Sequence, residues 1–147
     1  KQAIELIKQN QFDAIINIAA IADYSVSKIT ANGNDISGDK ISSEIDEMQI
    51  HLTKNPKLID EFKKLSNAKL VGFKLTANAN ENEVLAAVGK QIKSAKSDFV
   101  IHNDLTETSQ NKAQHSFHIY NNKGKKIADC VGVNSLSNTL WEFLWGK

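Results

Sequence analysis

The sequence predicts a three-layer α/β domain in which a mostly parallel sheet carries helices on both faces and ends in a β-hairpin and a helix. Two observations favour this fold class. Strand-like apolar runs alternate with segments of helical periodicity along most of the 147 residues, as in sheets with helical crossovers. Several runs are also apolar at consecutive positions, which is typical of strands buried on both faces. The length suits one domain, residues 1–147, with one hydrophobic core.

The first part of the chain is predicted to contain a helix, two strands and a long loop. Lys1–Asn10 has helical apolar spacing, and Asp13–Ala20 is an apolar run that predicts a strand buried on both faces. Residues Ile21–Asp39 are polar, contain glycine turns and exceed the length of an ordinary connection, so we expect a functional loop. Met48–Thr53 alternates apolar and polar residues, which predicts a strand covered on one face.

Three further helices are expected. One begins at Pro56, because Asn55 is a good N-cap and proline suits the first helical position. A second is capped by Asn80 and favoured by acidic residues in its first turn. Its expected buried face consists of Val84, Leu85, Val88 and Ile92. The last helix is expected to begin at Ser135 or Ser137, near the C-terminus.

The remaining predicted strands are Lys69–Leu75, Phe99–His102, His115–Tyr120 and Lys126–Val131, of which the last two form a hairpin. In open α/β sheets, ligands bind beyond the carboxyl ends of the strands. This rule selects segments that directly follow predicted strands, namely Ala19–Tyr24, Lys54–Pro56, Phe73–Thr76 and Asn103–Asp104.

The composition restricts the class of partner. The formal net charge is only +1, so we expect no nucleic-acid or membrane partner that binds by bulk charge. All 18 basic residues are lysines, so phosphate recognition must use lysine, backbone N–H groups or metal rather than arginine. Cys130 is the only cysteine and is expected to be buried, and we expect a cytoplasmic protein.

Four segments could carry chemistry, and each has a simpler structural explanation. Asp23 follows small residues and could bind Mg²⁺ or a ribose hydroxyl, or could cap a turn. Lys40, with Lys28 as a weaker candidate, could close over a polyphosphate or remain a solvated lysine. Lys54 precedes the expected helix start, a potential anion site, and Lys90 and Lys93 could bind phosphate or form a solvated helix rim.

Familiar catalytic fingerprints are absent from the sequence. There is no HExxH, CxxC, GxSxG, P-loop or GxGxxG pattern. His115 and His118 lie three apart in a predicted strand, where their side chains point to opposite faces and make a poor chelate. The sequence therefore indicates binding chemistry more than a protein nucleophile.

Several short motifs in order resemble one enzyme family from about Asp13 to the end. AAIADY is followed by DKISS, TKNPKLI, KLVGFKL and KSAKSDFVIHNDL, then by the hairpin and helix. This series resembles the C-terminal part of phosphopantothenoylcysteine synthetase, or phosphopantothenate–cysteine ligase, in its stand-alone bacterial form. The resemblance implies a Rossmann-like fold.

The resemblance also implies a reaction in coenzyme A biosynthesis. In that family, the carboxylate of 4′-phosphopantothenate attacks the α-phosphate of CTP or ATP, and cysteine then displaces the nucleotide from the acyl-nucleotide intermediate. Mg²⁺ is required, and the enzyme is usually a cytoplasmic homodimer. The substrate supplies the nucleophile, which agrees with the absence of a nucleophile–base pair in this sequence.

The family's functional residues map onto positions of this chain. Lys40 is implied as the catalytic lid lysine, within a mobile lid at residues 21–43. The implied nucleotide-binding residues are Asn17, Ile18, Ala19, Asp23, Lys40, Thr53, Lys54, Asn55, Pro56, Phe73, Lys90 and Lys93. Asn103 and Asp104 are implied substrate contacts, and Asp23 is the implied metal ligand.

One departure from the family pattern concerns the N-terminal side. The family carries a glycine-rich turn and an SNxSSG-like stretch that handles the acyl-nucleotide, and nothing before Asp13 matches them. We therefore expect a missing N-terminal segment or a partner chain to supply them. The alternatives are a non-catalytic nucleotide-binding fragment and an unrelated Rossmann-like oxidoreductase domain.

Overall fold

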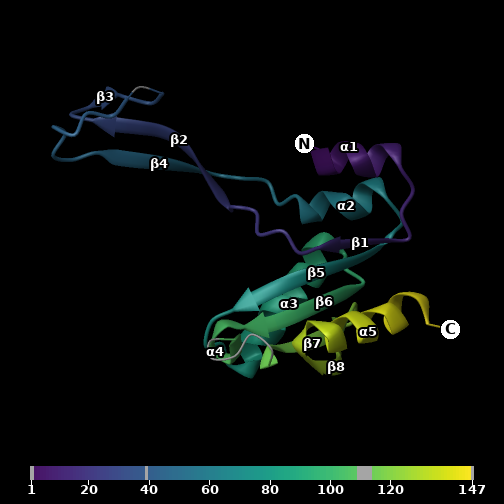
Figure 1. Ribbon diagram of the computed structural model, residues 1–147. Helices are drawn as coiled ribbons and strands as arrows, with labels where there is room; N and C mark the ends of the chain where they lie inside the picture. Colours follow the sequence, from purple (N-terminus) through teal and green to yellow (C-terminus); the bar gives the residue numbers. More distant parts are fainter. Residues whose placement is uncertain (1, 39, 109–113, 147) are drawn as a thin grey trace. The chain divides into compact units, whose positions relative to one another are not determined.

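The chain forms two compact units (Figure 1). The computed structural model describes residues 2–38, 40–108 and 114–146. The main unit comprises the chain up to Ala19 together with the chain from Leu58 onward, and the hairpin unit comprises Ala20–Lys57. The single domain expected from the length is therefore divided, with the hairpin unit inserted between the first and second strands of the main sheet.

The main unit contains the predicted α/β sheet. Its five strands lie in the order β1-β5-β6-β7-β8, with β1, β5 and β6 parallel and the last two antiparallel. Their bounds are β1 Ala14–Asn17, β5 Lys69–Thr76, β6 Phe99–Asp104, β7 Ser116–Asn121 and β8 Lys126–Val131. The sheet is mixed rather than wholly parallel, because the C-terminal hairpin completes it as predicted.

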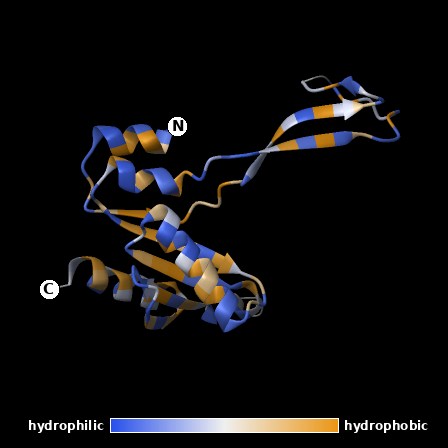
Figure 2. Ribbon diagram, turned by 180° about the vertical axis from the view of Figure 1, so that it is seen from behind, coloured by the Kyte–Doolittle hydropathy of each residue, from blue (hydrophilic) through white to orange (hydrophobic). Residues whose placement is uncertain are grey.

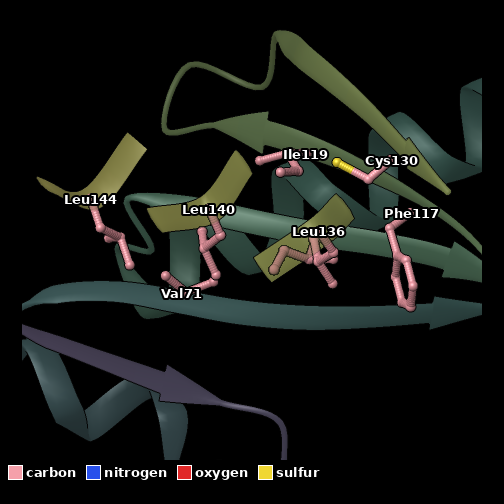
Figure 3. Close-up of a cluster of buried hydrophobic side chains, with 8 residues drawn as sticks. Val71, Phe117, Ile119, Cys130, Leu136, Leu140 and Leu144 are labelled. Atoms are coloured by element: carbon pink, nitrogen blue, oxygen red, sulfur yellow. The ribbon is translucent and has the colours of Figure 1, made fainter. Parts of the chain in front are cut away.

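Helices cover both faces of this sheet. Helix α5 (Gly132–Trp145) packs on one face, where Leu136, Leu140 and Leu144 meet Val71 and Ile101 (Figure 3). The helices of the other face are α1 (Gln2–Gln9), α2 (Ile59–Leu65) and α3 (Glu81–Ala95). Consecutive strand residues such as Leu70 and Val71 point to opposite layers, and both are fully buried. The three-layer fold class is confirmed.

Strand β1 differs from its prediction. It is four residues long and lies at the edge of the sheet, where β5 is its partner. Ile16 is 43% exposed, so the strand is not buried on both faces. A continuous apolar run is compatible with either a central or an edge strand, and periodicity alone does not distinguish them.

The hairpin unit corrects the expected loop. It contains a three-stranded antiparallel sheet in the order β3-β2-β4, with β2 at Tyr24–Ala31, β3 at Asn34–Asp35 and β4 at Gln49–Lys54. Strand β2 was not predicted because a bulge between Val26 and Lys28 interrupts its alternation. Strand β4 confirms the predicted strand, but it lies outside the main sheet and all its residues are exposed. Figure 2 shows the alternating hydropathy of both long strands.

Two helix starts were predicted incorrectly. Helix α2 begins at Ile59 rather than Pro56, and the side chain of Asn55 does not cap it. That side chain instead donates to the carbonyl of Ala22, over 2.9 Å, and accepts from Ser25 Oγ. Helix α5 begins at Gly132, before either candidate serine, with Val131 at the N-cap position. Tertiary hydrogen bonds and the turn after β8 therefore override local capping preference in these two places.

Helix α3 confirms the predicted cap. The side chain of Asn80 accepts from the Glu83 backbone, and the Glu83 side chain accepts from the Asn80 backbone, which forms a capping box. Val84 and Val88 are buried as expected, whereas Leu85 is 44% exposed and does not belong to the buried face. Cys130 is buried, as predicted. Within the described residues, no helix has the length and apolar character needed to cross a membrane.

Candidate functional site

The residues implied for ligand binding fall into two groups, one in each unit. The group in the main unit consists of Asn17, Ile18, Ala19, Phe73, Lys90, Lys93, Asn103 and Asp104. The group in the hairpin unit consists of Asp23, Lys40, Thr53, Lys54, Asn55 and Pro56.

In the main unit, the carboxyl end of β1 lies beside a close approach of helix α3 to the sheet. Asn17 ends β1 and is paired in register with Gly72 of β5. A Cβ atom at Gly72 would lie 2.0 Å from Gln91 Nε2 of α3, so glycine is what allows this approach. Lys90 adjoins Gln91 in sequence and is exposed. The local packing thus places an amide, open backbone and a lysine-bearing helix near one strand end.

The remaining main-unit candidates near this point differ in orientation. Lys93 is exposed on α3, and neither it nor Lys90 forms an ion pair within the described part of the chain. Phe73 follows Gly72, so its side chain points to the opposite face, where it packs against the α5 core. Its ring is therefore a core group in this unit, and its backbone is the part left near the strand ends.

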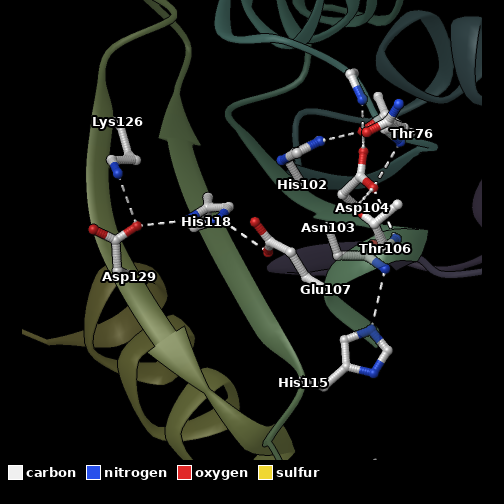
Figure 4. Close-up of polar contacts among 12 residues, drawn as sticks. Thr76, His102, Asn103, Asp104, Thr106, Glu107, His115, His118, Lys126 and Asp129 are labelled. Carbon is white, nitrogen blue, oxygen red and sulfur yellow. Dashed lines mark hydrogen bonds and ion pairs between the residues drawn. The ribbon is translucent and has the colours of Figure 1, made fainter. Parts of the chain in front are cut away.

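Asp104 fastens the carboxyl ends of β5 and β6. Its buried carboxylate accepts hydrogen bonds from the backbone of Asn78, Ala79 and Thr106 and from the hydroxyls of Thr76 and Thr106 (Figure 4). Hydrogen bonds from Thr106 and then Thr76 hold the pKa of Asp104 far below its usual range, despite the opposing effect of burial. The side chain is thus a fixed anion that orders the segment leading to α3.

Asn103 points to the other face of β6. Its amide nitrogen lies 3.3 Å from the ring of His115, which stacks on Phe117. His118, in contrast, stacks with His102 on the α3 face. The two histidines of the HSFH motif therefore lie on opposite faces, as predicted from strand geometry. Among the described residues, no three His, Cys, Asp or Glu side chains converge in a way that could hold a metal ion.

A polar cluster on the α3 face was not predicted. His102 Nε2 lies 2.8 Å from Thr76 Oγ1, and His118 lies between Asp129, at 2.5 Å, and Glu107, at 3.5 Å (Figure 4). His102, His118 and Glu107 line a cavity of about 450 Å³ between α3, β6 and β7. The sequence signal that could have revealed this cluster was strand alternation, because His102 of β6 and His118 of β7 are paired in register and therefore share a face of the sheet.

In the hairpin unit, Asp23 and Asn55 lie at the same end of the paired strands. The backbone N–H of Asn55 donates to the Asp23 carbonyl over 2.8 Å. Thr53 and Lys54 continue β4 opposite Ser25 and Tyr24, and both are exposed. The strand pairing therefore brings four of the predicted residues, Asp23, Thr53, Lys54 and Asn55, to one end of this sheet.

The two lysines considered for the lid have different surroundings. Lys28, in β2, lies 3.8 Å from the carboxylate of Asp35. Lys40 lies between β3 and β4, is exposed and forms no ion pair within the described residues. The anion site expected at a helix starting from Pro56 is not formed, because Pro56 precedes α2 by three residues and Lys54 belongs to a strand.

The chain matches one family model over nearly its whole length. Residues 2–143 match the DNA/pantothenate metabolism flavoprotein C-terminal domain. The chain is 33% identical over 107 residues to the coenzyme A biosynthesis bifunctional protein CoaBC of Methanocaldococcus jannaschii and 36% identical over 106 residues to that of Thermococcus kodakarensis. These alignments cover 72% and 71% of this chain, but only 24% of each relative, so the chain spans about a quarter of their length.

Solved structures share the fold. The DNA/pantothenate metabolism flavoprotein from Streptococcus pneumoniae superposes with a TM-score of 0.81 at 22% identity, covering 97% of this chain and 66% of that one. The C-terminal domain of a coenzyme A biosynthesis bifunctional protein CoaBC gives a TM-score of 0.60 at 15% identity, covering 97% of this chain and 58% of that one.

Proposed function

Because the chain belongs to the DNA/pantothenate metabolism flavoprotein C-terminal domain family, we propose that it is the nucleotide-binding part of a phosphopantothenate–cysteine ligase. In this proposal, CTP or ATP activates the carboxylate of 4′-phosphopantothenate, and the amine of cysteine then displaces the nucleotide. The observation that carries the proposal is the carboxyl end of β1, where Asn17 pairs with Gly72 of β5, which in turn approaches the lysine-bearing helix α3. This is the position at which parallel α/β sheets bind ligands.

The main unit would supply position and positive charge. The amide of Asn17 and the exposed Ile18 and Ala19 can hydrogen-bond a nucleotide through their polar groups, while Lys90 and Lys93 offer charge for phosphates that no ion pair balances among the described residues. Phosphoryl chemistry needs mainly positioning and charge stabilisation. Because the nucleophile belongs to the substrate, the protein needs no activated side chain to attack the α-phosphate.

The hairpin unit would supply the lid lysine and the metal ligand. Lys40, exposed and free of an ion pair in the described part of the chain, can neutralise the pyrophosphate as it leaves. The side chain of Asp23 suits Mg²⁺, because this ion is usually bound by one or two carboxylates and otherwise by water and substrate phosphates. Bound Mg²⁺ would offset the charge of the phosphates, and the contact of Asp23 with Asn55 fixes its backbone.

A nucleotide-binding assay tests this function. Calorimetric titration of the chain with CTP and with ATP, each with MgCl₂, should give saturable binding that weakens when Lys90 and Lys93 are both changed to Ala. Product formation from phosphopantothenate, nucleotide and cysteine is measured in parallel. Binding without turnover would favour the non-catalytic fragment, and binding of NADPH alone would favour an oxidoreductase domain.

The open edge of β1 supports a further segment in the working enzyme. An apolar hollow of about 300 Å³ lies beside this strand and is lined by residues that include Leu6, Phe12 and Ile16, all more than 40% exposed. An unpaired apolar strand edge is normally covered by another chain segment. We propose that a segment of the longer protein, or a partner chain, covers it and supplies the acyl-nucleotide contacts.

The apolar face of the hairpin unit supports a homodimer. Strand pairing places Val26 opposite Leu52 and Ile29 opposite Ile50, and Tyr24 follows on the same face. Val26, Ile50 and Leu52 are 56%, 56% and 58% exposed. A small two- or three-stranded sheet with one open apolar face gains stability when that face is covered. We propose that the same face of a second copy covers it.

The proposed contact is self-complementary. Identical apolar faces related by a two-fold axis bury each other, and this is the commonest symmetry of soluble oligomers. The other face of the unit carries Ser25, Lys28, His51 and Thr53, which are polar and suit solvent. The two faces therefore have distinct expected roles, and substitutions on each can be compared.

A further inference from the structure

The cavity of about 450 Å³ on the α3 face has a composition that the proposed ligation does not use. Val84 and Leu85 give it an aliphatic side, and Tyr120 contributes an aromatic ring. His102, Glu81 and Glu107 add polar groups from three different elements. None of these residues belongs to the set implied for nucleotide binding. Asp104, an implied substrate contact, also lines the cavity, but its carboxylate is engaged by Thr76 and Thr106.

The hydrogen bonds of His102 determine which of its ring nitrogens carries a proton. Asp104 is ionised and can only accept, so the single hydroxyl proton of Thr76 is donated to Asp104 over 2.5 Å. Thr76 Oγ1 must then accept from His102 Nε2, 2.8 Å away. Burial, followed by the nearby His118, lowers the pKa of His102 and keeps the ring neutral. His102 Nδ1 therefore carries a lone pair.

This lone pair has no donor. His102 is 3% exposed, and its Nδ1 atom has no hydrogen-bond partner among the described residues. Figure 4 shows this nitrogen on the side of the ring that faces away from Thr76, toward His118. A buried acceptor without a donor destabilises the protein, so a ligand donor that reaches it gains binding free energy.

The charges around the cavity favour a cation. Lys126 is 3.0 Å from Asp129, so its charge is already balanced. Among the described residues, the only ion pair of Glu107 is with the His118 ring, and Glu81 lies close enough to Tyr120 and Lys126 to influence the pKa of both. Two carboxylates thus remain at the rim. The described residues do not provide three convergent metal ligands, so the charge does not indicate a metal site.

We propose that this cavity binds a small primary ammonium compound, whose N–H groups donate to His102 Nδ1 and to the carboxylate of Glu107. An ammonium group has three donors and a compact charge, which matches one lone pair and nearby carboxylates. Because His102 is a largely buried residue of the cavity wall, a hydrogen bond to its ring forms in a low-dielectric environment, where it is strong. Tyr120 adds an aromatic surface for the cation.

The test is an NMR titration of the whole chain, labelled with ¹⁵N at histidine, with ethylammonium chloride. We expect a saturable change in the Nδ1 resonance of His102. Tetramethylammonium chloride is the matched control, because it carries the charge without N–H donors and should leave this resonance unchanged. L-cysteine is a second arm, since tighter binding than ethylammonium would identify an amino acid as the source of the ammonium group.

Variants at His102 separate the two ring nitrogens. His102→Gln keeps a donor to Thr76 but removes the acceptor at Nδ1, and it should weaken ethylammonium binding at least tenfold. His102→Asn keeps an acceptor near Nδ1 and should retain more of the affinity. The exposed Glu107→Gln substitution, which is not expected to affect folding, should weaken binding several-fold. Equal shifts with tetramethylammonium, or undiminished binding in both His102→Gln and Glu107→Gln, would overturn the proposal without affecting the proposed ligase function.

Discussion

In the main unit, Leu70, Ile101 and Ile119 are fully buried, whereas Val26, Ile50 and Leu52 in the hairpin unit are more than half exposed. Both sets are β-strand residues of similar size and hydropathy. The difference is that helices cover both faces of the main sheet, and Ala31 is the only buried residue among the described residues of the hairpin unit. Apolar strand residues thus have two uses in one chain: internal packing and a surface for association.

The largest expected effect is on the stability of the main unit. Ile101→Ala removes a fully buried side chain from β6 and should lower the free energy of unfolding by about 2–5 kcal/mol. Ile50→Ala is the matched change in the hairpin unit and should cost less than about 1 kcal/mol at protein concentrations where the chain is monomeric. Urea denaturation measures both. Equal losses would mean that the hairpin unit has an internal core of its own.

The next effect concerns the two lysines of the hairpin unit. Lys40→Ala should lower the rate of ligation in the longer enzyme about 10²-fold, comparable to the loss of one electrostatic donor in a transition state. In the chain itself, it should weaken CTP binding more than CMP binding, because CMP lacks the two outer phosphates. Lys28→Ala is the control, since Lys28 already pairs with Asp35. A defect confined to Lys28→Ala would mean that Lys28, and not Lys40, is the lid lysine.

Association of two copies should depend on one face of the hairpin unit. Leu52→Lys places a charge on the apolar face and should weaken dimerisation about tenfold or more, measured by sedimentation equilibrium. Thr53→Lys places the same charge on the opposite face and should leave the dimer intact. A dimer that survives Leu52→Lys but dissociates with Thr53→Lys would reverse the assignment of the faces.

The smallest expected effect is on proteolysis. Residues 40–48 connect strands without secondary structure and are exposed except for Ile45, so limited digestion should cut there before it cuts the main unit. CTP with MgCl₂ should slow this cleavage a few-fold if Lys40 closes over the phosphates. The control is the Lys40→Ala variant, whose rate of cleavage should be the same with and without nucleotide. Identical protection in both proteins would separate nucleotide binding from lid closure.

Sequence patterns predicted the main unit well because its periodicity follows from burial. The Asn80 cap of α3 depends on contacts within one helical turn, and the C-terminal hairpin on two strands that follow each other directly, so local patterns encode both. Strand β5 was predicted from its apolar run, although its partners β1 and β6 are distant in the sequence. The edge position of β1 could not be predicted, because it depends on what lies beyond the strand in space. The early start proposed for α2 was wrong because Asn55 bonds Ala22, 33 residues away.

The candidate site was predicted only in part for the same reason. The resemblance selected residues such as Asn17 and Lys90, but it could not predict the direction of their side chains. Phe73, for example, was selected as a nucleotide contact, and its side chain packs against the α5 core. The cluster around His102 has no local signature. It arises from the pairing of β6 with β7 and from a carboxylate, Asp104, that fixes the orientation of Thr76.

The bulge in β2 determines where the hairpin unit can change length. Before it, paired residues such as Val26 and Leu52 are in one register, and after it, Ile29 and Ile50 are in a register shifted by one residue. Loss of Ser27 would restore continuous pairing and keep every apolar residue on its present face. Loss of a residue beyond the bulge, such as Ile29, would turn the following part of the strand over and place Thr30 on the apolar face. Among single-residue deletions in the interior of β2, one at the bulge is therefore the change that this strand pairing can accept most easily.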